Sequence, residues 1–471
     1  MKKIPTILLL YGLSLFPLFA ENSNREDNTL RAKQNIRKSI AMIDSAMTHH
    51  FTDAGMARYY NPYTNALSEE KASVWMYTSA IEAVNAAIRA LSTLKQQGES
   101  DPYYNRNLKR CGKLLSQLYE NLEFYAGTFT LTSYTQTKQW TVYGVDRGQS
   151  KGTARVDGIY NVYDDQQWLI REMIESYRLT GNKKYLSKAE YLTEYVLDGW
   201  DCTLDENANE HGGITWGPGY TTKHACSNGP MISPLVWLSE LYSGKNDTIT
   251  YLYIDENGNR KTASSKKSDY YLKFAEKIYA WQKNHLLRKD GVFYDMLGGC
   301  VPDCTVAYET INGLTYRKHT PLKDAVGKAF TYNSGTMISG AANLYASTQN
   351  DTYIEDAKQL SRSSFACFAK LGATLPQYYT FPSEGFDHWF NGVLLRGYAE
   401  LYPVFPETET YIDSFQQNLD YACDHFLYKG VLPSGLLSGW KANHGANNTE
   451  GMFSFAFAGE YAVLAHHLFL K

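Results

Sequence analysis

The chain has 471 residues, with 46 lysine and arginine side chains against 49 aspartates and glutamates and a formal net charge of −3. A weakly acidic chain without blocks of lysine or arginine is a poor candidate for binding nucleic acid, so we exclude such a partner. Aromatic residues make up 14% of the chain; most such rings fill protein cores, but tyrosine and tryptophan faces also suit packing against sugar rings.

The first 20 residues, MKKIPTILLLYGLSLFPLFA, have the pattern of a cleavable export signal: lysines, an uncharged apolar stretch, then a small residue before ENSNRED. The alternative is an uncleaved anchor, but Pro5, Pro17 and the short core suit a spanning helix poorly. No cysteine lies near the cleavage point for a lipid anchor. We expect an exported protein, periplasmic or secreted, with no membrane contact after cleavage. Loss of Lys2 and Lys3 would leave 44 basic against 49 acidic side chains, a net charge of −5.

A repeat organises the rest of the chain. Four segments place a tyrosine, then leucine or isoleucine, then a small or apolar residue four positions after the tyrosine. A second apolar helical stretch precedes each copy, and a polar turn or a longer insertion separates the two. The repeating unit is therefore a helical hairpin. The four copies start at Tyr185, Tyr271, Tyr353 and Tyr411.

Apolar spacing of three and four predicts about twelve helices, which as six hairpins make an all-α fold, an (α/α)6 barrel. We expect a single catalytic domain over residues 21–471, with small β-hairpins inserted at 128–146, 248–263 and 291–316. The even-numbered helices carry few lysines and more small residues, which favours the inner ring. The predicted helices are 29–50, 72–97, 104–126, 164–180, 183–198, 229–243, 267–286, 333–347, 351–371, 384–403, 407–428 and 449–470.

The inner helices of such a barrel all start at one rim, so the loops before them would line a shared cleft. The six loops are rich in Gly, Asn, Tyr and Trp, which suits a site for a polar, ring-shaped ligand. Their sequences are ARYYNPYTN, DGIYNVY, HGGITWGPGYTTKHACSNG, KAFTYN, YYTFPSE and GWKANHGANN.

Two adjacent aspartates, Asp164 and Asp165, open one of these inner helices in the stretch YDDQQW. Local sequence favours a structural interpretation, because Asp is a good helix N-cap and Asp164 with Gln167 matches a capping box. A catalytic interpretation is also open. The pair lies at the predicted cleft rim, Tyr163 and Trp168 flank it, and a cap does not require two acids.

As a catalytic pair, neighbouring carboxylates at a helix start would flank a bond laid across the helix terminus. Their closeness allows the ~5–5.5 Å carboxyl separation of retaining glycosidases more easily than the ~6.5–9.5 Å of inverting ones. Each charge opposes the other, so the two pKa values should be pushed apart. One group then stays ionised as nucleophile while the other holds a proton for the leaving oxygen.

Other motifs are weak. GQSKG at 148–152 fits a nucleophile elbow formally but lies in a polar loop with no strand before it. Cys300 and Cys304 could close a small disulfide loop, and as a zinc site they lack a second cluster of ligands. In HGGITW, Gly213 serves either a sharp turn or close ligand approach, and Trp216 either the core or a ligand.

The chain contains the stretches DGIYNVYDDQQW, GGITW, KHACSNGP, YNSGTMISGAANLY and FNGVLLRGYAEL. In these stretches it resembles glycoside hydrolase family 76, the bacterial and fungal α-1,6-mannanases. The resemblance implies an (α/α)6 fold, a retaining mechanism, and no metal or other cofactor. Asp164 would be the nucleophile and Asp165 the general acid/base. YNSG at 332–335 stands where family members often have YNQG. The implied cleft residues are Gln167, Trp216, Lys223, Asn228, Tyr332 and Asn333.

The sequence therefore predicts an exported, monomeric endo-α-1,6-mannanase that cuts the mannan backbone through a covalent mannosyl-Asp164 intermediate. Its partner would be a polysaccharide or oligosaccharide. One alternative is a non-catalytic mannan-binding protein, which the intact aspartate pair argues against. The other is a different (α/α)6 enzyme, such as a sugar epimerase, which would place histidines at the inner rim.

Overall fold

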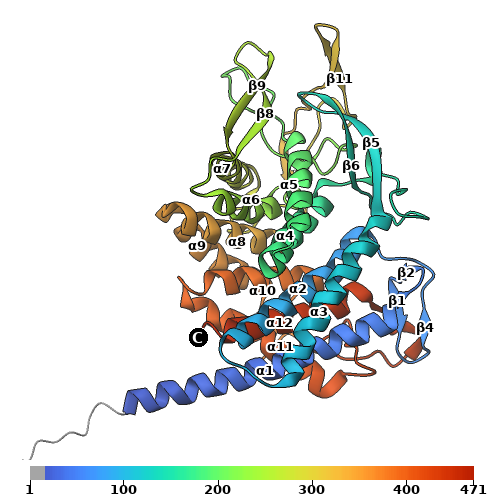
Figure 1. Cartoon of the computed structure of the whole chain (residues 1–471), viewed down its shortest axis with the longest axis vertical. Coiled ribbons are helices and arrows are strands. Elements are labelled where there is room, and N and C mark those ends of the chain that lie inside the picture. The colour runs from blue at the N-terminus through green and yellow to red at the C-terminus, as the bar shows by residue number, and fades with distance from the viewer. Residues whose placement is uncertain (1–15) are drawn as a thin grey trace, which may run out of the picture.

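A computed structural model describes residues 16–471, with side chains from residue 25 onward (Figure 1). The described chain is mainly helical, and each predicted helix has a counterpart, eleven of them close to the expected range. The helices are α1 (Phe16–His50), α2 (Val74–Gln96), α3 (Pro102–Leu122), α4 (Tyr163–Thr180), α5 (Lys183–Asp198), α6 (Gly229–Tyr242), α7 (Lys267–Leu286), α8 (Thr331–Thr348), α9 (Asp351–Phe368), α10 (Asp387–Leu401), α11 (Glu409–Phe426) and α12 (Gly451–Leu468).

The even-numbered helices form a closed ring, in which α2, α4, α6, α8, α10 and α12 each contact the next and α12 returns to α2. Each odd-numbered helix packs on a member of this ring. Burial separates the two sets: α12 buries 16 of its 18 residues, whereas α3 buries 6 of 21. The even-numbered set carries few lysines and more small residues, and its burial in the inner ring is what this composition predicts.

Glycines let two inner helices approach closely. A Cβ atom on Gly335 of α8 would lie 2.6 Å from the Val393 carbonyl oxygen of α10, and one on Gly397 would lie 2.7 Å from the Gly335 carbonyl oxygen. These separations are shorter than a side chain tolerates, so both positions require glycine.

Three β-hairpins project from the helical body at the top of Figure 1: β5–β6 (Ala126–Thr132, Thr137–Tyr143), β8–β9 (Thr248–Ile254, Arg260–Lys266) and β11–β12 (Tyr308–Ile311, Leu314–Arg317). The first two agree with the predicted insertions. The third differs, because β10 (Met296–Gly298) pairs with β7 (Lys223–His224) and β13 (Asp324–Val326). The remaining strands are β1 (Phe51–Thr52), β2 (Gly55–Met56), β3 (Tyr59–Asn61), β4 (Ala66–Leu67), β14 (Lys370–Leu371), β15 (Tyr379–Thr380) and β16 (Thr449–Glu450).

The N-terminal helix starts earlier than its apolar spacing predicts, at Phe16. Most of the predicted signal peptide, residues 1–15, lies outside the described residues. Packing against the body begins near Ala32 and Ile36, which are buried, whereas Leu30 is exposed. Within the described chain, no helix has the length and hydropathy needed to cross a bilayer.

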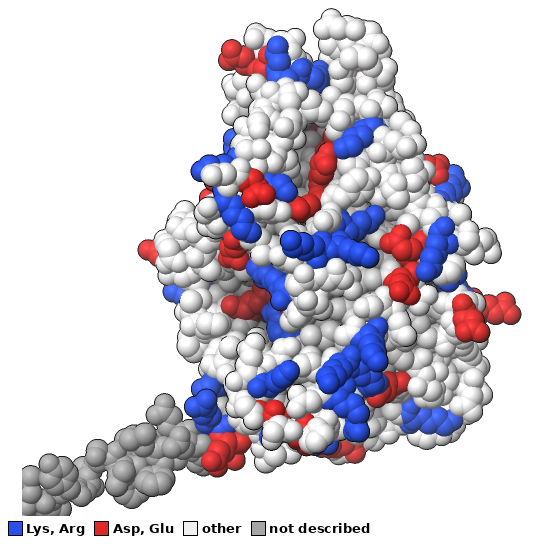
Figure 2. All heavy atoms as spheres, in the orientation of Figure 1, with Lys and Arg blue, Asp and Glu red and all other residues white. Residues whose placement is uncertain are grey.

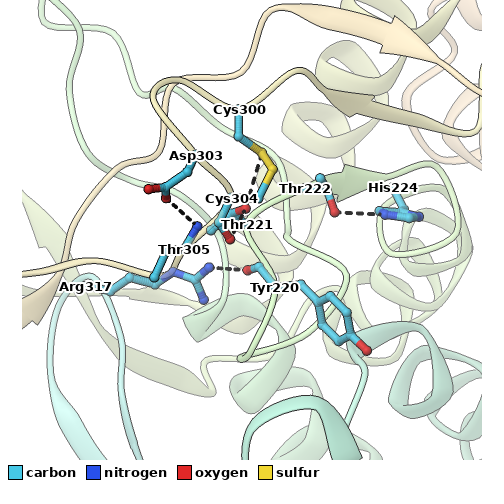
Figure 3. The surroundings of a disulfide bond; sticks show 9 residues. All are labelled: Tyr220, Thr221, Thr222, His224, Cys300, Asp303, Cys304, Thr305 and Arg317. Atoms are coloured by element: carbon cyan, nitrogen blue, oxygen red, sulfur yellow. Dashed lines mark hydrogen bonds between the residues drawn. A yellow bond between two sulfur atoms is a disulfide. The ribbon is translucent and has the colours of Figure 1, made fainter.

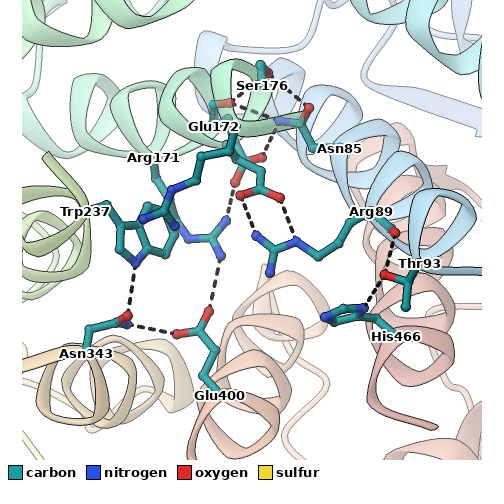
Figure 4. A network of polar contacts seen from close by, with 12 residues as sticks. Asn85, Arg89, Thr93, Arg171, Glu172, Ser176, Trp237, Asn343, Glu400 and His466 are labelled. Atoms are coloured by element: carbon teal, nitrogen blue, oxygen red, sulfur yellow. Dashed lines mark hydrogen bonds and ion pairs between the residues drawn. The ribbon is translucent and has the colours of Figure 1, made fainter. Parts of the chain in front are cut away.

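A network of buried charges crosses the inner ring further along α4 (Figure 4). Arg171 lies between Glu172 and Glu400, and Arg89 binds Glu175. The network lines a pocket of about 170 Å³ between α2, α4, α10 and α12. Arg171 lies seven residues after Asp164, about 10 Å further along the axis of α4. Its ion pair with Glu400, and that of Glu175 with Arg89, tie α4 to neighbouring helices and so support the helix that carries the aspartate pair.

Candidate active site

The aspartate pair lies two and three residues beyond the N-cap position of α4. The helix begins at Tyr163, and its N-cap position, Val162, makes no side-chain cap bond. The Gln167 amide donates to the Ser227 carbonyl at 2.6 Å instead of completing a capping box with Asp164. The first N–H of the helix, on Tyr163, donates 2.8 Å to the carbonyl of Trp216. The capping box favoured by the local sequence is therefore wrong, and neither carboxylate is needed to cap the helix.

Burial raises the pKa of both aspartates, but unequally. The Asp165 carboxyl has its pKa raised well above the ordinary value, because burial and the neighbouring charge of Asp164 act in the same direction. Burial raises the pKa of Asp164 to about 6, and the Cys226 thiol, the Trp216 indole N–H and the Asp165 backbone N–H, 3.1 Å from Asp164 Oδ1, oppose that rise. Asp164 therefore loses its proton first while Asp165 keeps one.

The loop of residues 211–228 carries Trp216 to this pair, and Asn228 holds the loop in shape. The Asn228 side chain is buried; its Oδ1 accepts from the Ile214 N–H at 2.8 Å, and its Nδ2 donates to the Ile214 and His224 carbonyls at 3.0 and 2.7 Å. Gly213 has a φ of +77°, and a Cβ there would lie 2.4 Å from the Trp281 ring. The Asn228 side chain and Gly213 therefore both stabilise the conformation of the loop.

We expect Asn228→Ala to lower the free energy of unfolding by about 2–4 kcal/mol, because the buried Ile214 N–H would lose its acceptor and two carbonyls would each lose a donor. Urea unfolding measures the change. Asn257→Ala, in the exposed turn between β8 and β9, is the control and should stay within about 0.5 kcal/mol of the parent. Parent-like stability of the Asn228 variant would show that the loop does not depend on this amide.

Hydrogen bonds from residues outside the 211–228 loop hold the segment that follows Trp216 in place (Figure 3). The Arg317 guanidinium donates to the Pro218 carbonyl at 3.1 Å and also to the Tyr220 carbonyl. The Thr221 hydroxyl donates 3.2 Å to the Cys304 carbonyl, beside the Cys300–Cys304 disulfide, so the small loop that the cysteine spacing allows is present. These contacts keep the Trp216 ring, which is partly exposed, stacked on His224 with ring centroids 4.9 Å apart.

Lys223 is almost fully buried and its ammonium group contacts protein atoms. It lies 2.9 Å from Asp201 Oδ2 and also donates to the Gly212 carbonyl. The same Asp201 oxygen is 2.7 Å from His319 Nδ1, and the His319 ring stacks on His211 at 3.5 Å. The Lys223 charge and the hydrogen bond with His319 hold the pKa of Asp201 well below its usual range, although burial opposes this. Asp201, His211 and His319 have no local sequence signal, and the sequence analysis missed them.

At the start of α8, Tyr332 is buried near Cys226, and the charges of Asp295 and Asp164 both contribute to raising its pKa. Burial also raises the pKa of Asp295 to about 6, which makes it a third acidic group in this neighbourhood that sequence analysis missed. Asn333 is fully buried, and neither amide atom finds a partner in the described chain.

The two aromatic residues that flank the pair in sequence pack in the core. Tyr163 contacts Tyr195 with ring centroids 5.1 Å apart, and Trp168 lies edge-on to Trp389 at 4.8 Å. The structure thus brings Asp164, Asp165, Trp216 and Tyr332 together. It gives Tyr163, Trp168, Gly213, Lys223 and Asn228 contacts with the protein itself. In the part of the chain that the structure describes, no cluster of three or more His, Cys, Asp or Glu side chains could hold a metal ion.

Comparison with known proteins shows the family to which the chain belongs. The sequence profile of glycosyl hydrolase family 76 matches residues 103–252 and 261–454, so the chain belongs to this family and is a glycoside hydrolase. None of the curated proteins matches the sequence significantly.

Solved structures of the same family share the fold. The family 76 mannosidase Bt3792 from Bacteroides thetaiotaomicron is similar with a TM-score of 0.66 and 20% identity, over 92% of this chain and 98% of that one. The α-mannanase BT2949 of the same species has a TM-score of 0.60 and 15% identity, over 92% and 95%. An inactive variant of the α-1,6-mannanase GH76A of Salegentibacter sp. HEL1_6, in complex with α-1,6-mannotetrose, has a TM-score of 0.58 and 16% identity, over 93% and 99%.

Proposed function

We propose that the protein is a retaining endo-α-1,6-mannanase that hydrolyses the backbone of α-mannan. The observation that carries this proposal is the adjacent pair of Asp164, which is partly exposed, and Asp165, which is buried; their pKa values are raised to different extents beside the Trp216 loop. The Salegentibacter relative supports it, because that α-1,6-mannanase was inactivated by replacing two adjacent aspartates.

In the proposed first step, ionised Asp164 attacks the anomeric carbon of the mannosyl unit. A C–O bond to Asp164 forms as the glycosidic C–O bond breaks, and the proton held by Asp165 passes to the leaving oxygen. In the second step Asp165, now ionised, takes a proton from water while the water oxygen attacks the same carbon and displaces Asp164. Two inversions give net retention, and both acids return to their starting states.

We also infer that the ring of even-numbered helices and its outer partners form an (α/α)6 barrel. Twelve helices in the described chain and the closure of α12 on α2 support this. We further propose that residues 1–20 are removed on export and that the periplasmic or secreted enzyme acts as a monomer. N-terminal sequencing of the exported protein tests the cleavage, and light scattering tests the assembly state.

Incubation with unbranched α-1,6-mannan tests the activity. Early release of oligosaccharides of several sizes, followed by chromatography, is the expected endo pattern. Release of mannose alone would contradict endo action. Tight binding of mannan without hydrolysis would favour a non-catalytic mannan-binding protein.

The pH profile should follow the two carboxyl groups. We expect kcat/KM for an aryl mannoside to rise with pH through about 6, because Asp164 must be ionised, and to fall again as Asp165 loses its proton. Since the Cys226 thiol lowers the pKa of Asp164, Cys226→Ala should move the rising limb to higher pH. A Cys226 variant whose rising limb stays in place, or moves to lower pH, would contradict the assignment of that limb to Asp164.

A further inference from the structure

A second groove lies on the outer side of the helical body, near the projecting hairpins. It encloses about 630 Å³ between the inner face of β8–β9, the start of α7, the end of α5 and the turn of β5–β6. Figure 2 shows the surface hollowed between the β8–β9 lobe and the neighbouring hairpins, with acidic atoms inside the hollow. Neither Asp164 nor Asp165 lines this groove, nor do Trp216 or Tyr332. It is therefore separate from the candidate active site.

One wall of the groove is a row of aromatic rings. The ring centroids of Tyr253 and Tyr251 are 6.4 Å apart, those of Tyr251 and Tyr270 are 4.9 Å apart, and those of Tyr270 and Phe274 are 4.9 Å apart. All four side chains are partly exposed, Tyr253 by 36%. A row of partly exposed rings marks a binding surface, and such rings pack against the apolar C–H faces of sugars.

The floor of the groove holds polar atoms that lack partners. Asp198 Oδ1 accepts from the Ser133 hydroxyl at 3.0 Å and the Gln136 amide at 2.9 Å, whereas Oδ2 is buried without a partner in the described chain. The hydroxyl of Ser265 is also buried and unpartnered, and Ser265 lies on the same face of the hairpin as Tyr251. Buried acceptors of this kind are normally satisfied by a ligand or by water, and sugar hydroxyls donate well to them.

The charges of the lining favour a neutral ligand over an anionic one. Four carboxylates and two ammonium groups line the groove: Glu194, Asp198, Glu210 and Asp269, with Lys273 and Lys277. The Lys277 ammonium is already bound to Glu210 at 2.8 Å. The lining therefore has more acidic than basic side chains, which opposes a polyanion and leaves an uncharged sugar chain as a suitable ligand.

The family sequence profile does not match the tip of the hairpin that forms the aromatic wall. The family match is interrupted over residues 253–260, which are the end of β8 and its turn. Tyr253 lies in this interruption, so the wall extends beyond the sequence pattern that the family shares.

We propose that this groove is a second carbohydrate-binding site, which holds a neutral segment of the mannan chain away from the catalytic pair. The identity of the sugar rests on the proposed function; the existence of the site does not. A polymer long enough to reach both places would gain affinity by effective concentration, whereas a short oligosaccharide bound in the cleft would gain none.

Affinity electrophoresis in gels that contain unbranched α-1,6-mannan tests the site, with Asp165→Asn present in every protein to prevent digestion. Adding Tyr251→Ala and Tyr253→Ala together should raise the apparent Kd for the polymer about 5–10-fold, which is the loss of two stacking contacts of about half a kcal/mol or more each. Tyr308→Ala is the matched control, because Tyr308 is 52% exposed on β11, outside the groove. Equal retardation of the double variant and its parent would overturn the proposal.

With the aspartate pair intact, the double variant should raise KM for the polymer several-fold with little change in kcat. A lower kcat with an unchanged KM would contradict the proposal that the groove binds the polymer. If the parent binds mannan through these tyrosines but does not cleave it, the groove stands and the proposed activity fails. If the parent cleaves mannan and the tyrosines have no effect, the proposed activity stands and the groove fails.

Discussion

Asp164→Asn is expected to lower kcat/KM on α-1,6-mannan by about 10⁴-fold or more, because the amide cannot form the covalent glycosyl intermediate. Asp165→Asn should cost about 10²–10⁴-fold on the same substrate, since the leaving oxygen would depart without a proton. An aryl mannoside whose leaving group needs no proton distinguishes the kinetics of the two variants. Asp165→Asn should then retain a fast first step, observed as a burst of aryl alcohol, and Asp164→Asn should not.

The melting temperatures of Asp164→Asn and Asp165→Asn serve as the control for these activity measurements. Both carboxyls have pKa values raised by burial, so their ionised forms are disfavoured in the folded state. A neutral amide of the same shape should leave the melting temperature unchanged or raise it at neutral pH. Inactive variants with melting temperatures far below that of the parent would show that activity is lost through unfolding. A burst with Asp164→Asn but not with Asp165→Asn would make Asp165 the nucleophile and Asp164 the general acid/base.

Arg171→Met should lower the free energy of unfolding by about 3–5 kcal/mol at neutral pH, because it leaves Glu172 and Glu400 without their buried partner. Arg171 lies in the inner ring, with its Nη2 3.5 Å from Glu400 Oε1 and a second contact to Glu172. Methionine fills a similar length without a charge, which limits the change in packing. Urea unfolding measures the loss, and Arg288→Met, which removes the exposed pair with Asp290, should cost at most about 1 kcal/mol.

The pH dependence of the Arg171 effect distinguishes charge from packing. Without the guanidinium, the pKa of Glu172, already raised by burial, rises further in the folded state. A carboxyl with a raised folded pKa destabilises the protein when ionised, and this penalty disappears below its unfolded pKa of about 4.3. The difference between parent and variant should therefore shrink as pH falls from 7 to 4. The same loss at both values would assign the effect to packing.

The helices were predictable because apolar spacing, few lysines and more small residues report burial directly. Both signals lie within each helix, so the even-numbered set was recognised from its own composition. The start of α4 was predicted to within one residue, but the way it is capped was not, because the first N–H of the helix, on Tyr163, donates to the carbonyl of Trp216, 53 residues away in the sequence. The third insertion was misjudged for the same reason, since β10 pairs with β7 more than 70 residues earlier.

The candidate site was predictable in part. The aspartate pair and Trp216 lie in short motifs, and the structure brings them together. Lys223 and Asn228 were expected to line the cleft, but the structure shows their polar groups bound to Asp201 and to the loop backbone. Their contact with substrate stays a prediction. Cys226 and Asp295 were missed, because a buried thiol and a lone aspartate carry no signal until the fold places them near Asp164.

The retaining scheme is tested most directly by following the anomeric form of the first products from unbranched α-1,6-mannan by NMR. Double displacement through Asp164 predicts that the α-anomer appears first and that the β-anomer grows in later by mutarotation. Initial release of the β-anomer would contradict the covalent intermediate and the assignment of Asp164 as nucleophile.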